Sequence, residues 1–311
     1  MSADKPITAP AADAIEQSIR QCYSTWSETY DRDYYQAATA YPPVHVDIVR
    51  RKLQSSGARS LIDAGCGPAS MLRRLTDLGL DLYGFDLTPA MVSQARQTMA
   101  GEFDVEQRLW EGSALDRTAF VAPDGRARFD AAVCFGVLPH IPAGSDRVVF
   151  ENLAKAVQPH GLVMVEARNQ LFSLFSLNRY SRDFFFRTLL DTEALRQSLD
   201  DDSARQLAKA IDLVEQRFRL DLPPERTGAA GAPGYDEVLS RTHNPFELCA
   251  VARQAGLLDV EVSFYHYHCL PPMAEPAMPA LYRELSLAME RPDDWRGHFM
   301  ASAFIVSGRA R

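Results

Sequence analysis

Two short segments carry residue types that could bind a charged small molecule. The first is Asp63-Ala64-Gly65-Cys66-Gly67, which ends an apolar run of strand length. Two glycines at a strand end permit a tight turn and a close approach of the backbone to a ligand. Ser70 stands where a dinucleotide-binding turn has its third glycine, and Asp63 stands two positions before the first one. Because a nearby positive charge favours a carboxylate, this turn indicates a cationic ligand rather than a pyrophosphate.

A second carboxylate ends the next apolar run. Asp86 closes Tyr83-Gly84-Phe85-Asp86 and lies about 20 residues after the glycines, where an acidic side chain at a strand tip accepts hydrogen bonds from ribose hydroxyls. The alternative is a helix cap, because Thr88-Pro89 begins the next helical stretch and either Asp or Thr could cap it. The glycine turn and the acid occur together, which favours ribose binding.

The elements that must position these residues alternate between strand and helix. Strands are expected at residues 60–64, 82–86, 105–110, 129–135 and 162–167, with helices between them at 69–78, 89–99, 114–121 and 146–157. After an interruption the pattern resumes with a helix at 245–255 and strands at 259–269 and 299–307. Such alternation predicts a parallel sheet that is covered by helices on both faces.

The same pattern divides the chain into four parts. Residues 1–14 are rich in Ala and Pro, and we expect them to be a disordered lead. Residues 15–167 form the core with its N-terminal helices. In residues 168–243 the alternation stops, and aromatic helical stretches with a Gly/Pro-rich loop at 222–234 predict an inserted helical lid. Residues 244–311 complete the core.

Composition limits the function classes. The chain has 311 residues, five scattered cysteines and a formal charge of −8, without a cluster of Lys or Arg. Nucleic-acid enzymes normally present a basic face to the phosphates, so we expect a small-molecule acceptor and no nucleic-acid partner. No apolar run reaches the roughly 18 to 20 residues of a membrane span, and no signal peptide is recognisable. We therefore expect a cytoplasmic enzyme without a membrane partner, as a monomer or a homodimer.

Taken in order, these motifs resemble those of the class I (Rossmann-like) S-adenosylmethionine (SAM)-dependent methyltransferase family. The resemblance runs from about residue 26 to residue 167 and again from 245 to the end. It implies methyl transfer, SAM as the cofactor, and an α/β fold. That fold is a seven-stranded, mostly parallel sheet with helices on both faces and a C-terminal antiparallel strand pair. The implied cofactor-binding residues are Tyr30, Asp63, Gly65, Cys66, Gly67, Asp86, Leu87, Met91, Ser113, Ala114, Cys134 and Phe135.

The resemblance assigns these residues to different parts of SAM. The loop Asp63–Gly67 holds the methionine part and Asp86 holds the ribose. Ser113 stands in the adenine loop, where family members often carry Asp, so its hydroxyl or backbone groups would replace a carboxylate. Tyr30 belongs to an aromatic helix that lies over the cofactor. Alternatively, the helical spacing of these aromatic residues describes a face that only packs.

Catalysis in this family places few demands on side chains. Methyl transfer from a sulfonium is an in-line displacement, so alignment and desolvation can supply most of the rate. A general base is needed only if the acceptor keeps its proton until attack. The candidate catalytic residues are His140, Asn169 and Tyr180, with Glu166 as a further candidate base near the end of the fifth strand. His140 could equally make a structural hydrogen bond in its turn.

The acceptor and two rival functions stay open. The lid sequence at residues 168–180 is similar to methyltransferases of polysaccharide and specialised-metabolite pathways, which favours a polar metabolite methylated on O, N or C. One rival is an enzyme of the same fold that uses SAM itself as substrate and cyclises or cleaves its aminoalkyl chain. The other is an NAD(P)-linked oxidoreductase, against which the missing third glycine counts. His266 and His268 share a strand face without a third ligand, so no metal site is expected.

Overall fold

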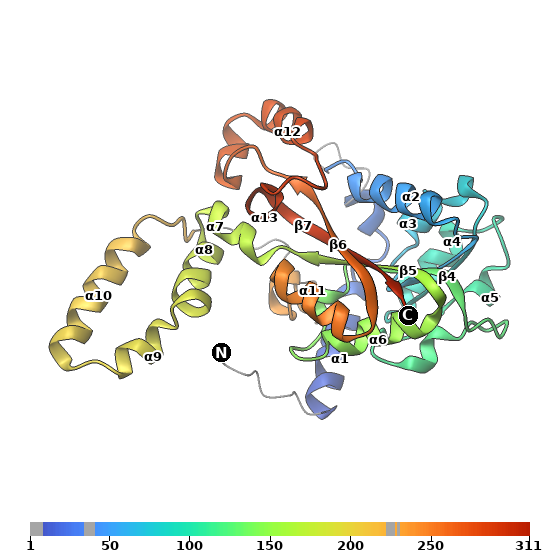
Figure 1. The fold of residues 1–311 in the computed structure, drawn as a ribbon, viewed down its shortest axis with the longest axis horizontal. Helices are drawn as coiled ribbons and strands as arrows, with labels where there is room; N and C mark the ends of the chain where they lie inside the picture. Colours follow the sequence, from blue (N-terminus) through green and yellow to red (C-terminus); the bar gives the residue numbers. More distant parts are fainter. Residues whose placement is uncertain (1–8, 34–40, 222–227, 229–230) are drawn as a thin grey trace.

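The chain folds around one seven-stranded sheet. The structure is a computed structural model that describes residues 9–33, 41–221, 228 and 231–311 (Figure 1). The strands are β1 (Ser60–Ala64), β2 (Asp81–Asp86), β3 (Leu109–Glu111), β4 (Phe129–Cys134), β5 (Val157–Arg168), β6 (Leu257–Tyr267) and β7 (Ala301–Ala310). Their order is β3-β2-β1-β4-β5-β7-β6, and β7 runs antiparallel to both of its neighbours. The predicted fold class is confirmed.

Helices cover both faces of the sheet. Apolar side chains of α2 (Val44–Ser56), α3 (Ser70–Arg73) and α4 (Pro89–Thr98) pack on one face, against side chains such as Leu61 of β1. On the other face, α6 (Asp146–Ala156) and α11 (Pro245–Gln254) pack against the alternate residues, such as Ile62. Short 3-10 turns complete these layers at Thr76–Leu78, Arg117–Phe120 and Leu138–His140. The strands are apolar on both sides because both sides are buried.

The third strand is shorter than predicted. Residues 105–110 were expected to form a strand, but the structure has a helical turn, α5 (Val105–Arg108), followed by β3. The Asp104 carboxylate accepts hydrogen bonds from the backbone N–H groups of Glu106 and Gln107 and so caps this turn. A side-chain cap can override the strand preference of a short apolar run. The expectation over residues 105–108 was therefore wrong.

The N-terminal part begins its helix earlier than expected. Helix α1 spans Ala9–Ser24, so the predicted disordered lead over residues 1–14 is helical from Ala9 onwards. The sequence from Ala9 to Ala12 is rich in alanine, the best helix former, and proline is tolerated in a first helical turn. Residues 1–8 lie outside the described part of the chain. Helix α2 begins directly after Pro43.

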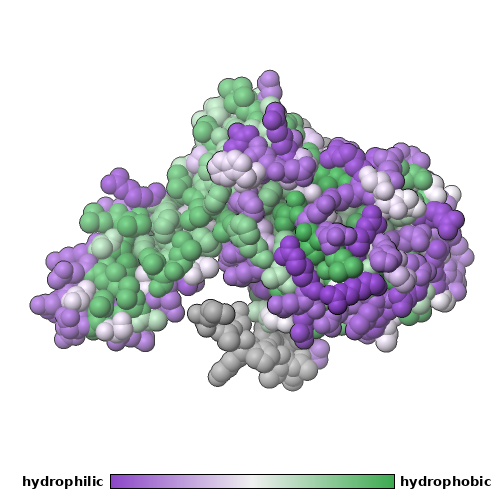
Figure 2. All heavy atoms as spheres, viewed as in Figure 1, coloured by the Kyte–Doolittle hydropathy of each residue, from purple (hydrophilic) through white to green (hydrophobic). Residues whose placement is uncertain are grey.

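Residues 168–243 form a chain of short helices. They are η5 (Gln170–Phe172), α7 (Ser173–Ser176), α8 (Arg179–Asp183), the π-helical turn η6 (Phe184–Leu189), α9 (Thr192–Gln197), α10 (Asp201–Glu215) and η7 (Tyr235–Glu237). Figure 1 shows that α9 and α10 project away from the sheet as an arm, and Figure 2 shows apolar surface along it. Phe185 and Phe186 pack against Phe218 within this arm. Most of the loop predicted at 222–234 lies outside the described residues.

A second helical segment, which the sequence reading did not anticipate, connects β6 to β7. It contains η8 (Pro272–Ala277), α12 (Pro279–Ala288) and α13 (Gly297–Met300), and Figure 1 shows it beside the ends of these strands. Pro279 stands in the first turn of α12, where the missing N–H costs nothing. Among the described residues, no helix is long and apolar enough to cross a bilayer.

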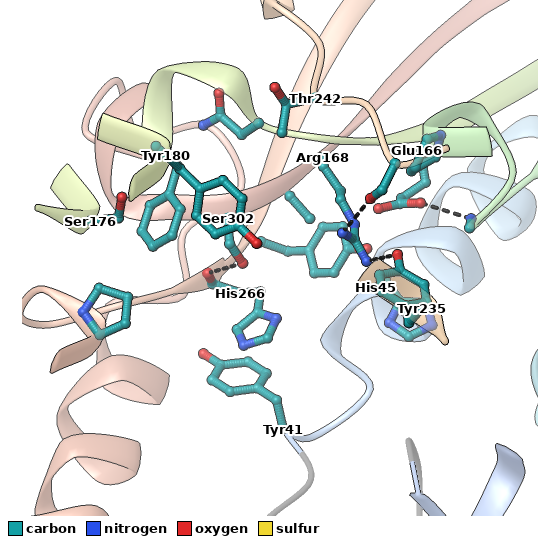
Figure 3. A pocket seen from close by; sticks show the side chains of 18 of the residues that line it. Tyr41, His45, Glu166, Arg168, Ser176, Tyr180, Tyr235, Thr242, His266 and Ser302 are labelled. Carbon is teal, nitrogen blue, oxygen red and sulfur yellow. Dashed lines mark hydrogen bonds between the residues drawn. The ribbon is translucent and has the colours of Figure 1, made fainter. Parts of the chain in front are cut away.

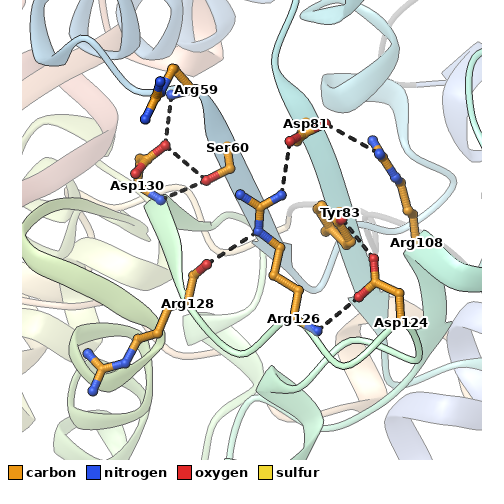
Figure 4. Close-up of polar contacts among 9 residues, drawn as sticks. All are labelled: Arg59, Ser60, Asp81, Tyr83, Arg108, Asp124, Arg126, Arg128 and Asp130. Carbon is orange, nitrogen blue, oxygen red and sulfur yellow. Dashed lines mark hydrogen bonds and ion pairs between the residues drawn. The ribbon is translucent and has the colours of Figure 1, made fainter.

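The N-terminal ends of the strands are held by a polar network (Figure 4). Asp130 of β4 accepts hydrogen bonds from the backbone N–H of Arg59 and from the Ser60 hydroxyl, both at 3.0 Å. Asp81, the first residue of β2, pairs with Arg126 at 2.9 Å and with Arg108 at 3.3 Å. At this end of the strands, both carboxylates therefore have partners within the protein.

Candidate active site

The opposite edge of the sheet, at the C-terminal end of β1, carries the predicted glycine turn. Gly65 and Gly67 have φ angles of +87° and +52°, in the left-handed region that glycine tolerates best. A Cβ atom on Gly65 would lie 2.1 Å from Cγ2 of Val137, so any other residue would force this side chain to move. The Gly67 N–H donates to Oδ2 of Asp86 at 2.8 Å. The turn and the tip of β2 thus form one unit.

Two carboxylates are buried under this unit. Asp86 also accepts the backbone N–H of Thr88 at 2.8 Å through Oδ1, while the Thr88 side chain makes no capping bond to α4. Burial raises the pKa of Asp86, although its two backbone hydrogen bonds oppose the shift. Burial, reinforced by Asp86, raises the pKa of Asp63 to about 8. Among the described residues, Oδ1 of Asp63 has no hydrogen-bond partner, so this edge fits a cation that is not part of the protein.

A narrow cleft of about 100 Å³ lies over the glycine turn. Nine of the twelve predicted cofactor residues line it: Tyr30, Gly65, Gly67, Asp86, Leu87, Met91, Ser113, Ala114 and Phe135. The other three, Asp63, Cys66 and Cys134, are buried beneath it. Burial raises the pKa of both thiols, which keeps them neutral. Their place in the core is typical of cysteines that pack rather than react.

Helix α1 closes the cleft from above. Glu16 accepts a hydrogen bond from the Ser113 hydroxyl at 2.6 Å, and Arg20 forms an ion pair with Glu111. The Tyr23 hydroxyl contacts Nε2 of His140 at 2.8 Å. Small-molecule sites commonly measure about 300 to 1,000 Å³, so the cleft is narrow because this helix lies in it.

A second cavity, of about 1250 Å³, adjoins the cleft (Figure 3). Both ends of the segment 168–243 contribute to its wall, from Arg168 to Tyr180 and from Tyr235 to Thr242, whereas α9 and α10 line neither cavity. Further rings come from His45 and Tyr41. Four residues line both spaces, namely Tyr23, Tyr30, Phe135 and Gly136. These four form the boundary between the cleft and the large cavity.

His140 lies on the cleft side of this boundary and is held at both ring nitrogens. Nδ1 lies 2.7 Å from the carbonyl oxygen of Leu239, and a carbonyl can only accept, so Nδ1 carries the proton. Nε2 therefore accepts from the Tyr23 hydroxyl. Burial lowers the pKa of His140 to about 4. His140 lines the cleft but not the large cavity, which fits the structural alternative for this residue.

The other two predicted catalytic residues lie at the large cavity but in different situations. The Asn169 amide donates to the carbonyl oxygens of Gly297, His298 and Ala301, and its Oδ1 accepts the N–H of Leu171. These bonds tie β5 to the segment before β7, so the side chain holds the fold. The Tyr180 hydroxyl accepts a hydrogen bond from Arg179 at 3.1 Å, and its ring is exposed.

Glu166 is better placed at the boundary than any of these three. It lies two residues before the end of β5, and its Oε2 accepts the N–H of Gly136 at 2.8 Å (Figure 3). Its side chain is buried, yet it lines the large cavity. Arg168 lies beyond it, over the ring of Tyr235 and in contact with the Tyr235 hydroxyl.

Two histidines of the cavity wall, His45 and His266, pack against aromatic rings. His45 is in the first turn of α2, where it reads as an ordinary helix residue, but it packs beside Phe135 and Tyr265. His266 stacks on Tyr41 with ring centroids 4.0 Å apart, and His268 stacks on His266 at 5.0 Å. In the part of the chain that the structure describes, no group of three or more His, Cys, Asp or Glu side chains could hold a metal ion.

Comparison with known proteins identifies the central part of the chain. A family model described as a methyltransferase domain matches residues 62–163. A ubiquinone biosynthesis O-methyltransferase of Xanthomonas oryzae pv. oryzae is 26% identical over 185 residues, which cover 58% of this chain and 74% of that protein. The protein of the same name from Xanthomonas axonopodis pv. citri is 26% identical over 151 residues, covering 48% and 59%.

Two solved methyltransferase structures align with most of the chain. A magnesium protoporphyrin IX methyltransferase from Synechocystis with bound S-adenosylhomocysteine (SAH) aligns with a TM-score of 0.49 and 13% identity, covering 95% of this chain and 99% of that one. A SAM-dependent methyltransferase from Archaeoglobus fulgidus aligns with a TM-score of 0.46 and 10% identity, covering 91% and 99%.

The family match covers most of the cleft. Residues 62–163 contain the glycine turn, Asp86, the loop at Ser113 and the boundary residues Phe135 and Gly136. The oxidoreductase alternative is thereby excluded, and SAM is the cofactor of this enzyme. Residues 62–163, about a third of the chain, thus match a methyltransferase domain, and the protein is a SAM-dependent methyltransferase with a Rossmann-like fold.

Proposed function

We propose that this methyltransferase transfers the methyl group to an oxygen atom of a small-molecule acceptor bound in the large cavity. One observation carries the proposal. The cofactor cleft and the cavity share the four boundary residues, so a methyl donor in the cleft faces an acceptor in the cavity across Phe135 and Gly136. The 26% identity to O-methyltransferases over 58% of the chain supports oxygen as the acceptor atom.

The cofactor would bind at the C-terminal ends of β1 and β2. The unpartnered oxygen of Asp63 fits the ammonium group, and Asp86 fits the ribose hydroxyls because its backbone bonds orient the carboxylate. Ser113, Ala114 and Met91 line the part of the cleft that would take the adenine. Helix α1 must move outward for a molecule of this size to enter, which breaks the Glu16–Ser113 hydrogen bond. When bound, SAM supplies an activated methyl group on a sulfonium.

The cavity indicates an acceptor of considerable size. Its volume of about 1250 Å³ exceeds what a single small ring fills. Aromatic rings alternate with polar groups along its wall, including Tyr41, Tyr180, Tyr235 and Arg168. Such a wall suits a flat or partly apolar molecule with hydroxyl groups. The formal charge of −8 does not favour a nucleic acid.

The protein's own residues supply alignment and exclusion of water. Tyr23 of α1 and Tyr30, which follows this helix, cover the boundary, and Phe135 closes it from the end of β4. Both ends of the segment 168–243 would act as the lid by walling the cavity, while α9 and α10 extend away from it (Figure 1). Correct placement of two reactants can contribute an effective molarity on the order of 10⁵ M or more.

The test is product analysis with purified protein, SAM and a panel of hydroxylated acceptors. We expect SAH to form only when an acceptor is present, together with an acceptor heavier by one methyl group that is bound to oxygen. Methylation of nitrogen or carbon would overturn the choice of oxygen. A product derived from the aminoalkyl chain of SAM, formed without an acceptor, would instead establish SAM as the substrate.

A further inference from the structure

The structure places a buried carboxyl group, that of Glu166, at the meeting point of cleft and cavity. Glu166 accepts the Gly136 N–H at 2.8 Å, and Gly136 lines both spaces. This bond uses Oε2, and the Tyr265 side chain also hydrogen-bonds to the Glu166 carboxylate. The side chain itself lines the large cavity, where the acceptor would lie. A carboxylate in this position is within reach of a group that points from the cavity toward the cleft.

The surroundings of Glu166 suit a proton acceptor. Burial raises its pKa, and the Gly136 N–H, Arg168, Tyr265 and His243 oppose this shift. From the neighbouring helix α2, His45 faces Tyr265, and burial lowers the pKa of His45 to about 4, so it stays neutral. Cys134, on the adjacent strand, also stays neutral. A carboxylate with a raised pKa is a stronger base.

The other candidate groups are less well placed. His140 lines only the cleft, and both of its ring nitrogens are engaged by Leu239 and Tyr23. The Asn169 amide does not titrate and is bonded to three carbonyl groups. Tyr180 is exposed and accepts from Arg179. Glu166 alone among these candidates both lines the large cavity and hydrogen-bonds to a residue of the boundary.

We propose that Glu166 is the general base of the reaction, and that the acceptor therefore presents a hydroxyl group at the boundary. The inference rests on the proposed function. The hydroxyl proton passes to the Glu166 carboxylate while the oxygen forms its bond to the methyl carbon. The carbon–sulfur bond breaks and its electron pair stays on sulfur, which neutralises the sulfonium. The proton on Glu166 is released to solvent after the product leaves.

The decisive variant is Glu166→Gln, because the amide oxygen can still accept the Gly136 N–H. We expect kcat to fall by about 10²- to 10⁴-fold, with SAM affinity within twofold of wild type. The wild-type rate should rise with pH as Glu166 loses its proton, and this rise should disappear in the variant. Glu166→Asp keeps a carboxyl group and should retain the rise at a reduced rate. These measurements use the acceptor that is identified by the product analysis.

An infrared pH titration of the ligand-free protein gives a readout that does not depend on turnover. We expect a protonated-carboxyl band that titrates above the ordinary range of glutamate and is missing in Glu166→Gln. Glu290→Gln serves as the matched control, since Glu290 is another carboxylate whose pKa burial raises, but it bonds Tyr41 and Tyr267. Glu290→Gln should leave the band of Glu166 in place and remove a different protonated-carboxyl band.

The outcomes separate the two proposals. A Glu166→Gln protein that binds SAM and keeps both the wild-type rate and its pH dependence overturns Glu166 as the base, while methyl transfer stands. Absence of the titrating band also overturns it. A wild-type protein that makes no methylated product from any acceptor overturns the proposed function, and the role of Glu166 falls with it even if the infrared band is present.

Discussion

The two ends of β2 carry the same residue type in opposite situations. Asp81 begins the strand and pairs with Arg126 and Arg108, and the hydrogen bond from Arg126 is the largest cause that lowers its pKa (Figure 4). Asp86 ends the strand, where burial raises its pKa and its hydrogen bonds come from the backbone N–H groups of Gly67 and Thr88 and from the Thr88 side chain. At the N-terminal end of β2 the protein's own arginines pair with the carboxylate. At the C-terminal end we expect a bound ligand to interact with it.

This difference separates structural from functional carboxylates better than residue type does. Asp130, at the start of β4, has hydrogen-bond donors on the adjacent strand, namely Ser60 and the Arg59 backbone. At the other edge, Asp63 keeps an oxygen without a partner among the described residues. A buried charge that lacks a partner destabilises the folded protein, so its presence at one edge points to binding.

The largest effect is expected where the backbone of the functional edge is changed. Gly65→Ala places a Cβ atom 2.1 Å from Val137 and imposes a φ of +87° on an L-residue. We expect SAM binding to fall below detection, and the free energy of unfolding to drop by about 2 kcal/mol or more. Gly67→Ala is the matched control, because a Cβ there has no atom within 4 Å, and should cost only about 1 kcal/mol. Calorimetric titration with SAM and chemical unfolding measure both.

A smaller effect is expected when Asp63 is replaced by asparagine, which should raise the free energy of unfolding but lower the affinity for SAM. Its pKa rises from 3.8 to about 8 on folding, so between these values the folded chain holds a proton that the unfolded chain has released. The free energy of unfolding therefore falls as pH rises through this window, by at most about 1.4 kcal/mol per pH unit. Asp63→Asn should remove this slope.

The ligand-free Asp63→Asn protein should then be more stable than wild type at pH 8 and yet bind SAM more weakly. Urea unfolding at pH 5 and pH 8, with SAM titration of the same samples, measures both quantities. If the free energy of unfolding depends on pH equally in wild type and Asp63→Asn, the pKa of Asp63 is not raised on folding and this prediction is wrong.

The smallest effect is expected at the paired edge. Arg126→Ala removes the 2.9 Å ion pair between Arg126 and Asp81. Both side chains are partly exposed, so the free energy of unfolding should fall by only about 0.2 to 1 kcal/mol at pH 7. Because the pKa of Asp81 is lowered on folding, this contribution is present above its ordinary pKa and disappears as pH falls through the folded value. SAM affinity should not change, and a loss of several-fold would break the distinction between the edges.

The sequence was informative where the chemistry is local. The glycine turn needs only its own backbone conformation and a strand before it, and Asp86 needs only the next strand tip. Both are therefore predictable from spacing. The expected strand at 105–110 failed for a local reason too, because the Asp104 side chain caps a helical turn in place of the strand.

The catalytic residues were harder to predict because their roles depend on distant contacts. His140 is engaged by Tyr23, which lies 117 positions away, and Asn169 by carbonyl groups about 130 positions away. No periodicity reports such contacts. Glu166 was recognisable as a candidate from its place on the fifth strand, but only the Gly136 bond shows that it reaches the boundary. The helices between β6 and β7 also went unrecognised.

The most direct test of the central claim makes the same change at both ends of β2. SAM affinity is measured calorimetrically for the wild-type protein, Asp86→Asn and Asp81→Asn. Charge-assisted hydrogen bonds contribute about 1.5 to 3 kcal/mol, so Asp86→Asn should weaken SAM binding by about tenfold or more. Asp81→Asn should leave the affinity within twofold of wild type. Equal losses in the two variants, or no loss in Asp86→Asn, would contradict the assignment of the cofactor to this edge of the sheet.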